Sequence, residues 1–448
     1  MCFANTEGGM EINLDKIKCD DIVKILFAEN PGVVIQVADK HKAEVKKILE
    51  DAGVGYVKIG VPTEERHILA TLHDATYQFG IDYLRDVWYS TSYLLDRKQS
   101  MNGCAKKRFE NYKQQPLEFV FDKSFTGKLS QFGLDPNHRT PSGIKAAIIR
   151  EKGTNGEREM AYMLYLAGFD VKDVTMTDLI SGRETLEDIN MVVYCGGFSN
   201  SDVLGSAKGW AGSFLFNPKA KAALDNFYAR EDTLSLGVCN GCQLMMELGL
   251  ITPEDKKKGK MLHNDSHKFE SNFLGVTVPM NRSVMFGSLS GSKLGIWVAH
   301  GEGKFSLPYP EDHYNVVLKY SYDEYPGNPN GSDYSVAGIA SQDGRHLAMM
   351  PHLERACFPW ENAYYPLDRK EEDQITPWME AFVNARKWVE ANREKIIQYD
   401  RNTIQSGGAP QAHLHLFFIF SSAQSPGFPS LHLNGFLYSF HQKNGTQI

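Results

Sequence analysis

The segment Ser235–Gln243, with the sequence Ser-Leu-Gly-Val-Cys-Asn-Gly-Cys-Gln, constrains the fold of this chain more than any other. It begins as an apolar strand, breaks at Cys239, and continues into the apolar, helix-forming stretch 244–250. This pattern is typical of a nucleophile elbow, a sharp strand-to-helix turn at the carboxyl end of a sheet. Gly237 and Gly241 suit a turn that has little room for Cβ atoms. Amides at the start of the helix would stabilise a thiolate at Cys239 and the oxyanion that its attack creates.

The same segment allows other interpretations. Cysteine often packs as a small hydrophobic residue. Cys239 and Cys242 also form a Cys-x-x-Cys pair, which occurs in redox centres and in zinc sites. The sequence contains no second Cys-x-x-Cys pair, which argues against zinc. Thioredoxin-like chemistry needs a short βαβ domain, and this chain is much longer.

A second segment, 345–355, supplies a base for the cysteine. Its sequence is Arg-His-Leu-Ala-Met-Met-Pro-His-Leu-Glu-Arg, an apolar strand ending at Pro351, with His352 and Glu354 two residues apart. In an extended segment, residues i and i+2 point the same way, so the carboxylate can orient an imidazole that faces the cysteine. Alone, His352 would more often merely cap a strand. Together with the elbow, the pattern predicts a Cys-His-Glu triad.

These motifs resemble those of the class I (triad) glutamine amidotransferases, Gly-x-Cys-x-Gly-x-Gln with a distal Pro-His-x-Glu-Arg. More closely, roughly residues 1–395 resemble the carboxy-terminal part of the large single-chain phosphoribosylformylglycinamidine synthase of purine biosynthesis. One departure is Leu353, where the family more often has proline, and it changes neither the imidazole nor the carboxylate. The other segments that carry the resemblance are Cys-Gly-Gly-Phe-Ser-Asn-Ser-Asp-Val-Leu-Gly at 195–205, Ala-His-Gly-Glu-Gly at 299–303, and Tyr-Pro-Gly-Asn-Pro-Asn-Gly-Ser at 325–332.

The resemblance implies hydrolysis of glutamine, whose ammonia passes to a synthetase half of the same enzyme. That half converts formylglycinamide ribonucleotide to formylglycinamidine ribonucleotide with ATP and Mg²⁺, and the glutaminase domain itself needs no cofactor or metal. Considered alone, the glycine pair 196–197 would be a plain turn and His300 would more often be structural. The residues to which the resemblance gives roles are Cys239 (nucleophile), His352 (base), Glu354 (orienting the base), Gly197 and Asn240 (oxyanion hole), and Gln243, His300 and Gly301 (glutamine pocket).

Composition excludes several other classes of protein. The net charge of −7, with no stripe rich in Lys or Arg, argues against binding of nucleic acid. No apolar run reaches membrane-spanning length, and the first residues do not form a signal peptide. The seven cysteines are scattered without a disulfide framework, so we expect a cytoplasmic protein. With 448 residues, the chain is long enough for two or three domains.

Four parts are expected along the chain. Residues 1–115 predict an α+β unit. By resemblance, this unit is a fragment of the synthetase half, the carboxy-terminal lobe of an aminoimidazole ribonucleotide synthetase-like module. The family's ATP-binding sequence would precede Met1. Residues 116–142 lack periodicity and predict a linker. Residues 143–400 alternate strands and helices, which predicts an α/β, doubly wound, flavodoxin-like glutaminase domain. Residues 401–448, nearly free of charge, predict a disordered tail.

Individual elements follow from apolar periodicity and turn residues. A hairpin is expected where the strands 336–340 and 346–350 flank Asp343-Gly344. The expected strands are 33–37, 56–60, 144–149, 171–176, 191–194 and 234–239, and the expected helices are 40–52, 81–97, 378–398 and one that follows the turn 153–156 and ends at 166.

Two other functions are compatible with the sequence. A related small flavodoxin-like cysteine hydrolase or chaperone would lack the late Pro-His-x-Glu-Arg segment, so residues 351–355 argue against it. A catalytically silent fragment is the second, because the glutaminase activity of this family is coupled to the synthetase site. Glutamate release from glutamine, with and without a synthetase half, distinguishes these alternatives.

Overall fold

The computed structural model describes residues 7–114 and 117–405. The described residues up to Lys395 form one compact unit, and helix α10 spans Trp378–Gln405. Except for residues 401–405, which belong to α10, the predicted tail 401–448 lies outside the described residues. In the described part of the chain, no helix is long and apolar enough to cross a membrane.

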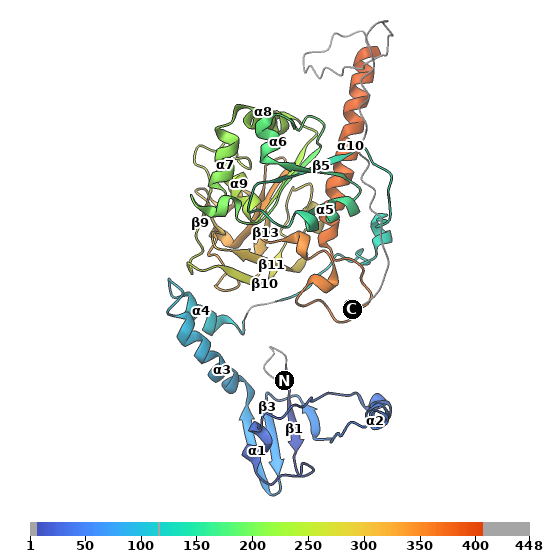
Figure 1. The fold of residues 1–448 in the computed structure, drawn as a ribbon, viewed down its shortest axis with the longest axis vertical. Coiled ribbons are helices and arrows are strands. Elements are labelled where there is room, and N and C mark those ends of the chain that lie inside the picture. The colour runs from blue at the N-terminus through green and yellow to red at the C-terminus, as the bar shows by residue number, and fades with distance from the viewer. Residues whose placement is uncertain (1–6, 115–116, 406–448) are drawn as a thin grey trace, which may run out of the picture. The chain divides into compact units, whose positions relative to one another are not determined.

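A nine-stranded sheet runs in the order β11-β10-β13-β14-β15-β8-β7-β5-β6 (Figure 1). Five neighbouring strands of this sheet are parallel. Numbered along the chain, these five lie in the order 2-1-3-4-5, which is the flavodoxin-like doubly wound order. The predicted fold class is therefore confirmed. The five strands are β5 (Lys145–Arg150), β6 (Asp170–Thr175), β7 (Met191–Tyr194), β8 (Leu234–Val238) and β15 (His346–Met349).

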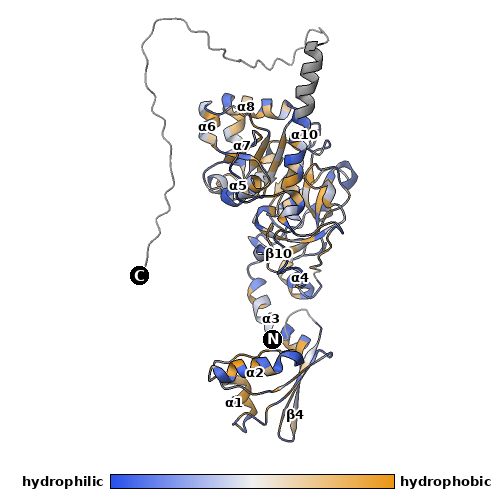
Figure 2. Ribbon diagram, turned by 90° about the vertical axis from the view of Figure 1, so that its right-hand side faces the viewer, coloured by the Kyte–Doolittle hydropathy of each residue, from blue (hydrophilic) through white to orange (hydrophobic). Residues whose placement is uncertain are grey.

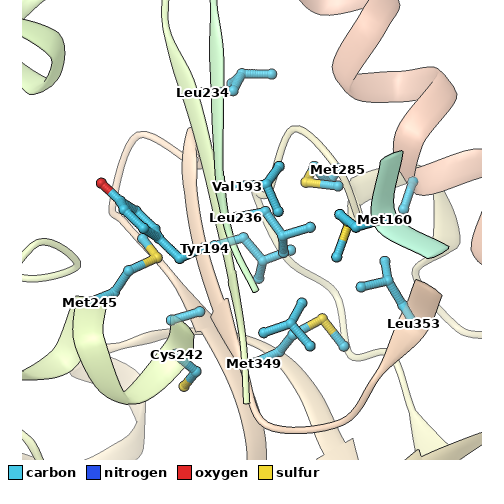
Figure 3. Close-up of a cluster of buried hydrophobic side chains, with 14 of the residues drawn as sticks. Met160, Val193, Tyr194, Leu234, Leu236, Cys242, Met245, Met285, Met349 and Leu353 are labelled. Atoms are coloured by element: carbon cyan, nitrogen blue, oxygen red, sulfur yellow. The ribbon is translucent and has the colours of Figure 1, made fainter. Parts of the chain in front are cut away.

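The parallel strands are continuous apolar runs because helices cover both of their faces. Every residue of β7 and β8 is buried. In Figure 3, Tyr194 and Met245 lie on one side of these strands, and Met160, Met285 and Leu353 lie on the other. Figure 2 shows hydrophilic as well as hydrophobic residues along helices such as α8, which face the core on one side only. The helices are α5 (Glu157–Leu166), α6 (Met176–Ser181), α7 (Lys208–Leu215), α8 (Pro218–Ala229) and α9 (Asn240–Glu247).

An antiparallel half extends the sheet beyond β15. The predicted hairpin is confirmed, since β14 (Val336–Ala340) pairs antiparallel with β15. Helix α10 begins where the Thr-Pro pair 376–377 predicted a helix start, and Trp378 Nε1 donates to Gly295 O at 3.0 Å. The remaining strands are β13 (Asn315–Tyr320), β10 (Glu270–Thr277) and β11 (Lys293–His300), with a separate pair formed by β9 (Lys260–Leu262) and β12 (Lys304–Ser306).

The amino-terminal residues form a four-stranded sheet in the order β2-β1-β3-β4, with helices beside it, as expected for an α+β unit. Its buried core is small, with Leu14, Ala70 and Leu72 at the centre. The elements are β1 (Gly9–Asn13), α1 (Ile22–Phe27), α2 (Lys42–Asp51), β2 (Gly60–Thr63), β3 (His67–Leu72), β4 (Ala75–Gly80), α3 (Ile81–Asp96) and α4 (Cys104–Asn111).

Two strand predictions in this unit are wrong. Residues 33–37 form no strand, and Val33 is 87% exposed. The strand expected at 56–60 begins only at Gly60, as β2. Strand propensity reflects packing on a pleated, half-buried surface, and an exposed segment without a partner strand lacks that surface. The helices expected at 40–52 and 81–97 are confirmed as α2 and α3.

The segment expected to be a linker has little regular structure. It contains one 3-10 turn, Leu129–Phe132, and Val120 makes a single antiparallel bridge to Lys293 of β11. Phe125 is buried, and other aromatic residues of the segment pack against the core of the large sheet. The segment therefore lies on the surface of the nine-stranded unit.

Candidate active site

Cys239 occupies a strained turn between β8 and α9. Its φ of 53° and ψ of −106° lie outside the regions that L-residues ordinarily adopt. Its N–H donates to Met349 O at 2.9 Å, which ties the turn to β15. A Cβ at Gly241 would lie 2.1 Å from Tyr194 O, and one at Gly237 would lie 2.5 Å from Gly241 O. Both glycines are thus required for the turn, as the sequence predicted.

The sheet register brings His352 to the cysteine. Because β15 lies parallel to β8 with Met349 opposite Val238, both chains leave the sheet at the same edge. His352 N then donates to Trp297 O at 2.9 Å, which anchors it to β11. A Cβ on Gly196 would lie 2.7 Å from His352 Cε1 and 3.4 Å from Cys239 Cβ, so these residues meet at one point.

Glu354 completes the arrangement that the sequence predicted. His352 Nδ1 and Glu354 Oε1 are 2.7 Å apart, and their side chains are 3% and 1% exposed. A carboxylate only accepts, so Nδ1 carries the proton and Nε2 is left for the cysteine. Burial alone would lower the pKa of His352, but the charges of Glu354 and Cys239 outweigh burial and raise this pKa to about 10.

A glycine loop and the first amide of α9 lie beside Cys239. Gly197 has a φ of 118°, and a Cβ there would lie 2.6 Å from Gly153 O, so only glycine fits. Asn155 N donates to Gly196 O at 2.9 Å, which fixes the loop. The N–H of Asn240, at the first position of the helix, has no acceptor within the helix.

Asn240 and Gln243 link the loops around the cysteine. Asn240 Oδ1 accepts from Ser199 N at 3.1 Å, and its Nδ2 donates to Gln243 Oε1 at 2.9 Å. Gln243 Nε2 in turn donates to Glu302 O at 2.7 Å. The side-chain amide of Gln243, predicted to line the glutamine pocket, therefore holds the loop 300–303 in place.

His300 has an unusual environment for a buried imidazole. It is 2% exposed, and within residues 7–114 and 117–405 neither ring nitrogen has a hydrogen-bond partner. Burial and the nearby charge of His352 lower the pKa of His300 to about 3, so its ring is neutral. A Cβ at the neighbouring Gly301 would project into open space. Both predicted pocket residues thus belong to the loop that Gln243 holds.

Other buried polar atoms near the triad also lack partners among the described residues. They include Ser199 Oγ, Asp202 Oδ1 and Glu354 Oε2. Buried polar atoms without partners are uncommon and mark places where a ligand or water binds. Asn200, Ser201 and Asp202 all have positive φ, which adds backbone strain in the loop after β7. No motif predicts these features, because they depend on what surrounds each atom after folding.

The metal and redox interpretations of Cys239 and Cys242 gain no support. All six cysteines in the described residues are free, and burial raises the pKa of the Cys242 thiol well above its usual value. His263 and His267 form a His-x-x-x-His pair that sequence reasoning missed, with ring centroids 5.9 Å apart. No group of three or more His, Cys, Asp or Glu in the described part of the chain is placed to hold a metal ion.

A doubly wound flavodoxin-like sheet, with a strained cysteine at its elbow and a buried His-Glu pair beside it, defines a triad-type amidotransferase fold. Residues 143–389 match the family model of the CobB/CobQ-like glutamine amidotransferase domain. Residues 1–73 match the C-terminal domain of AIR synthase related proteins. The chain belongs to the CobB/CobQ-like glutamine amidotransferase family.

Two relatives support the resemblance seen in the motifs. The chain is 37% identical over 417 residues to the probable phosphoribosylformylglycinamidine synthase, chloroplastic/mitochondrial, of Arabidopsis thaliana, which covers 87% of this chain. It is 38% identical over 405 residues to the phosphoribosylformylglycinamidine synthase of Homo sapiens, which covers 82% of it. A solved structure of PurLQS from Thermotoga maritima is 27% identical, covering 55% of this chain and 99% of that one, with a TM-score of 0.42. The resemblance to phosphoribosylformylglycinamidine synthase is confirmed, and the chain spans 29% of the length of each of the two relatives.

Proposed function

We propose that this chain hydrolyses glutamine to glutamate and ammonia. The ammonia serves the ATP-dependent conversion of formylglycinamide ribonucleotide to formylglycinamidine ribonucleotide in purine biosynthesis. The observation that carries the glutaminase proposal is the buried His352–Glu354 hydrogen bond of 2.7 Å beside the strained Cys239. The names of the relatives support the second part of the proposal.

The reaction follows from which groups hold the protons. The raised pKa keeps His352 protonated at neutral pH, which stabilises negative charge on Cys239 Sγ. The sulfur attacks the amide carbon of the glutamine side chain and forms a C–S bond. As the C–N bond breaks, His352 Nε2 donates its proton and ammonia leaves. The neutral imidazole then takes a proton from water, the hydroxide attacks the thioester, and glutamate is released. Glu354 keeps Nδ1 protonated throughout.

Backbone amides and one loop bind the substrate in this proposal. The amides near Gly197 and at Asn240 stabilise the tetrahedral oxyanion. His300 and Gly301 contact glutamine, and the two unpartnered nitrogens of His300 offer it one donor and one acceptor. Gln243 contributes by holding this loop.

The domain assignment remains part of the proposal. Residues 143–400 form the amidotransferase domain, residues 116–142 join it to the preceding part, and residues 1–115 belong to the synthetase half. ATP and Mg²⁺ belong to the synthetase half, as the resemblance to phosphoribosylformylglycinamidine synthase implies. The proposed steps of glutamine hydrolysis use neither ATP nor Mg²⁺. The free cysteines support a reducing compartment, for which we propose the cytoplasm.

Labelling with a glutamine-analogue diazoketone tests the nucleophile. One thiol should react, and peptide mapping should place the adduct on Cys239. An adduct on Cys242 or Cys195 would contradict the assignment. Cys239→Ala should abolish glutamate release, measured with and without an added synthetase half, while the circular dichroism spectrum stays unchanged.

Two histidine variants test the roles assigned around the cysteine. His352→Asn should lower kcat far more than it changes KM, because a general base acts mainly in the transition state. His300→Asn should mainly raise KM. Equal losses of kcat in the two variants would mean that the base is misassigned.

A further inference from the structure

The end of α3 and the helix α4 contact the nine-stranded unit through buried charges. Neither family model covers these residues, which lie between residues 73 and 143. Asp96, at the end of α3, pairs with Arg108 of α4 at 3.2 Å and with Lys268 at 2.7 Å. Glu270, at the start of β10, pairs with the same Arg108 at 2.9 Å. The side chains of the two carboxylates are 11% and 7% exposed.

Arg108 is the cation that joins the two carboxylates. Its Nη1 donates to Asp96, and its Nη2 donates to Glu270 and to the hydroxyl of Tyr325. Ser266 Oγ also donates to Glu270, at 2.5 Å. Charges this buried stabilise a structure only when their hydrogen bonds are complete, and here each carboxylate has several donors. Arg108 therefore fixes the beginning of β10 to the helix pair.

The turn between α3 and α4 also holds the backbone that precedes β10. Asn102 Nδ2 donates to Asp265 O at 2.8 Å, and Met101 N donates to Ser266 O at 3.0 Å. Together with Lys268 and Glu270, these bonds fasten the loop 263–270 at four positions.

Asn264, near the start of this loop, contacts the loop 300–303 directly. It is fully buried, and its N–H donates to Gly301 O at 2.9 Å. Its Nδ2 donates to His300 O at 2.7 Å, and its Oδ1 accepts from Gly303 N at 3.0 Å. One buried residue thus satisfies three backbone groups of the loop 300–303.

We propose that Arg108 and Asn264 are positioning residues of the glutaminase reaction. Arg108 holds the loop 263–270 against α3 and α4. Asn264 belongs to that loop, and its hydrogen bonds hold the loop 300–303 in turn. The effect on glutamine binding rests on the proposed function, whereas the mechanical link between the two loops does not. It follows that Asp96 and Arg108, which the proposed domain assignment places in the synthetase half, support the glutamine pocket of the amidotransferase domain, although both precede the family match that begins at residue 143.

Kinetics of the full chain test the positioning role. Arg108→Gln should raise KM for glutamine roughly 2- to 30-fold, the range for couplings through packed networks, with kcat nearly unchanged. Asn264→Asp should raise KM further, because a carboxylate would face the carbonyl of His300. If Arg108 acts on the loop 300–303 through Asn264, the variant with both substitutions should have a KM for glutamine no higher than that of Asn264→Asp alone. Additive losses would overturn the link.

Arg369→Gln is the matched control. Like Arg108, Arg369 makes two charged hydrogen bonds, in its case both to Asp373, at 2.9 and 3.1 Å, and its side chain is 28% exposed against 35% for Arg108. These bonds of Arg369 reach none of the loops near the triad. The KM of Arg369→Gln for glutamine should therefore equal that of the wild type. An equal rise of KM in Arg369→Gln and Arg108→Gln would overturn the proposal.

Hydrogen exchange tests the link without any activity. The Gly303 amide, bonded to Asn264 Oδ1, should exchange faster in Arg108→Gln than in the wild type or in Arg369→Gln. Unchanged exchange would overturn the proposal. A wild-type chain that releases no glutamate, but whose Arg108→Gln variant exchanges faster at Gly303, would refute the proposed function and support the link.

Discussion

Replacing Glu354 by glutamine should remove most of the glutaminase turnover while leaving the site intact. Glutamine has nearly the same shape and keeps an oxygen that can accept from His352 Nδ1, now 2.7 Å from the carboxylate. The variant loses only the negative charge, which lies on a side chain that is 1% exposed. That charge is the largest of the effects that raise the pKa of His352 against burial.

The magnitude follows from that pKa. It rises from 6.5 to about 10, so the surrounding charges and hydrogen bonds outweigh burial by roughly 5 kcal/mol. Hydrogen bonds to charged groups contribute roughly 1.5–3 kcal/mol, and Glu354→Gln replaces the charged partner of His352 by a neutral one. A barrier higher by that amount slows turnover by roughly 10- to 160-fold. Loss of the correct tautomer would add to the effect.

Glutamate release at saturating glutamine measures turnover, and the rate of iodoacetamide alkylation against pH reports on Cys239. In Glu354→Gln the alkylation rate at about pH 9 should fall, because the lowered pKa of His352 leaves its ring neutral there and the ring no longer stabilises the thiolate, whereas the wild-type ring is still largely protonated. Glu361→Gln is the control, since Glu361 is a nearby carboxyl that accepts from Phe358 N at 3.0 Å rather than from His352. Turnover of Glu354→Gln within threefold of the wild type would refute the reasoning.

Three further results are expected. Gly241→Ala should destabilise the protein by roughly 1–3 kcal/mol in urea unfolding, because its Cβ would lie 2.1 Å from Tyr194 O, whereas Gly212→Ala, whose Cβ would meet only a ring at 3.7 Å, should not. The pKa of His352 is raised, so the contribution of its protonated ring to stability is present below pH 6.5 and is lost as the pH rises to about 10. The difference in unfolding free energy between the wild type and His352→Gln should therefore shrink over that interval. Cys242→Ala should retain glutamate release. A variant that releases no glutamate would favour the interpretation in which Cys239 and Cys242 act together as a Cys-x-x-Cys pair.

The predictions that succeeded rest on local constraints. Gly237 and Gly241 are needed within a few residues of Cys239, and His352 and Glu354 are two residues apart, so short motifs carried the information. The strands β7 and β8 were recognisable because every residue in them is buried. The strand expected at 33–37 failed for the opposite reason, since Val33, Val34 and Ile35 are exposed and no strand among the described residues pairs with them.

The features that the sequence did not reveal are relations between distant segments. The role of Asn264 depends on three backbone groups of the loop 300–303, and that of Arg108 on carboxylates from α3 and β10. An asparagine or an arginine has many ordinary uses, and no spacing marks these two. Their partners are defined only after the sheet has formed.

The register of two parallel strands explains why the triad assembles at all. Met349 lies opposite Val238, so the residue after β8 and the residues after β15 emerge at the same edge. A slip of one residue would turn every side chain of a strand to the other face and separate the cysteine from the histidine. Both strands are buried on both faces, and alternation of polar and apolar residues cannot set their register. The hydrogen bond from Cys239 N to Met349 O belongs to the ladder between these two strands, and the chain turns sharply directly after that nitrogen. The same pairing of β8 with β15 therefore fixes both the point at which the elbow begins and the point at which the chain leaves β15 toward His352.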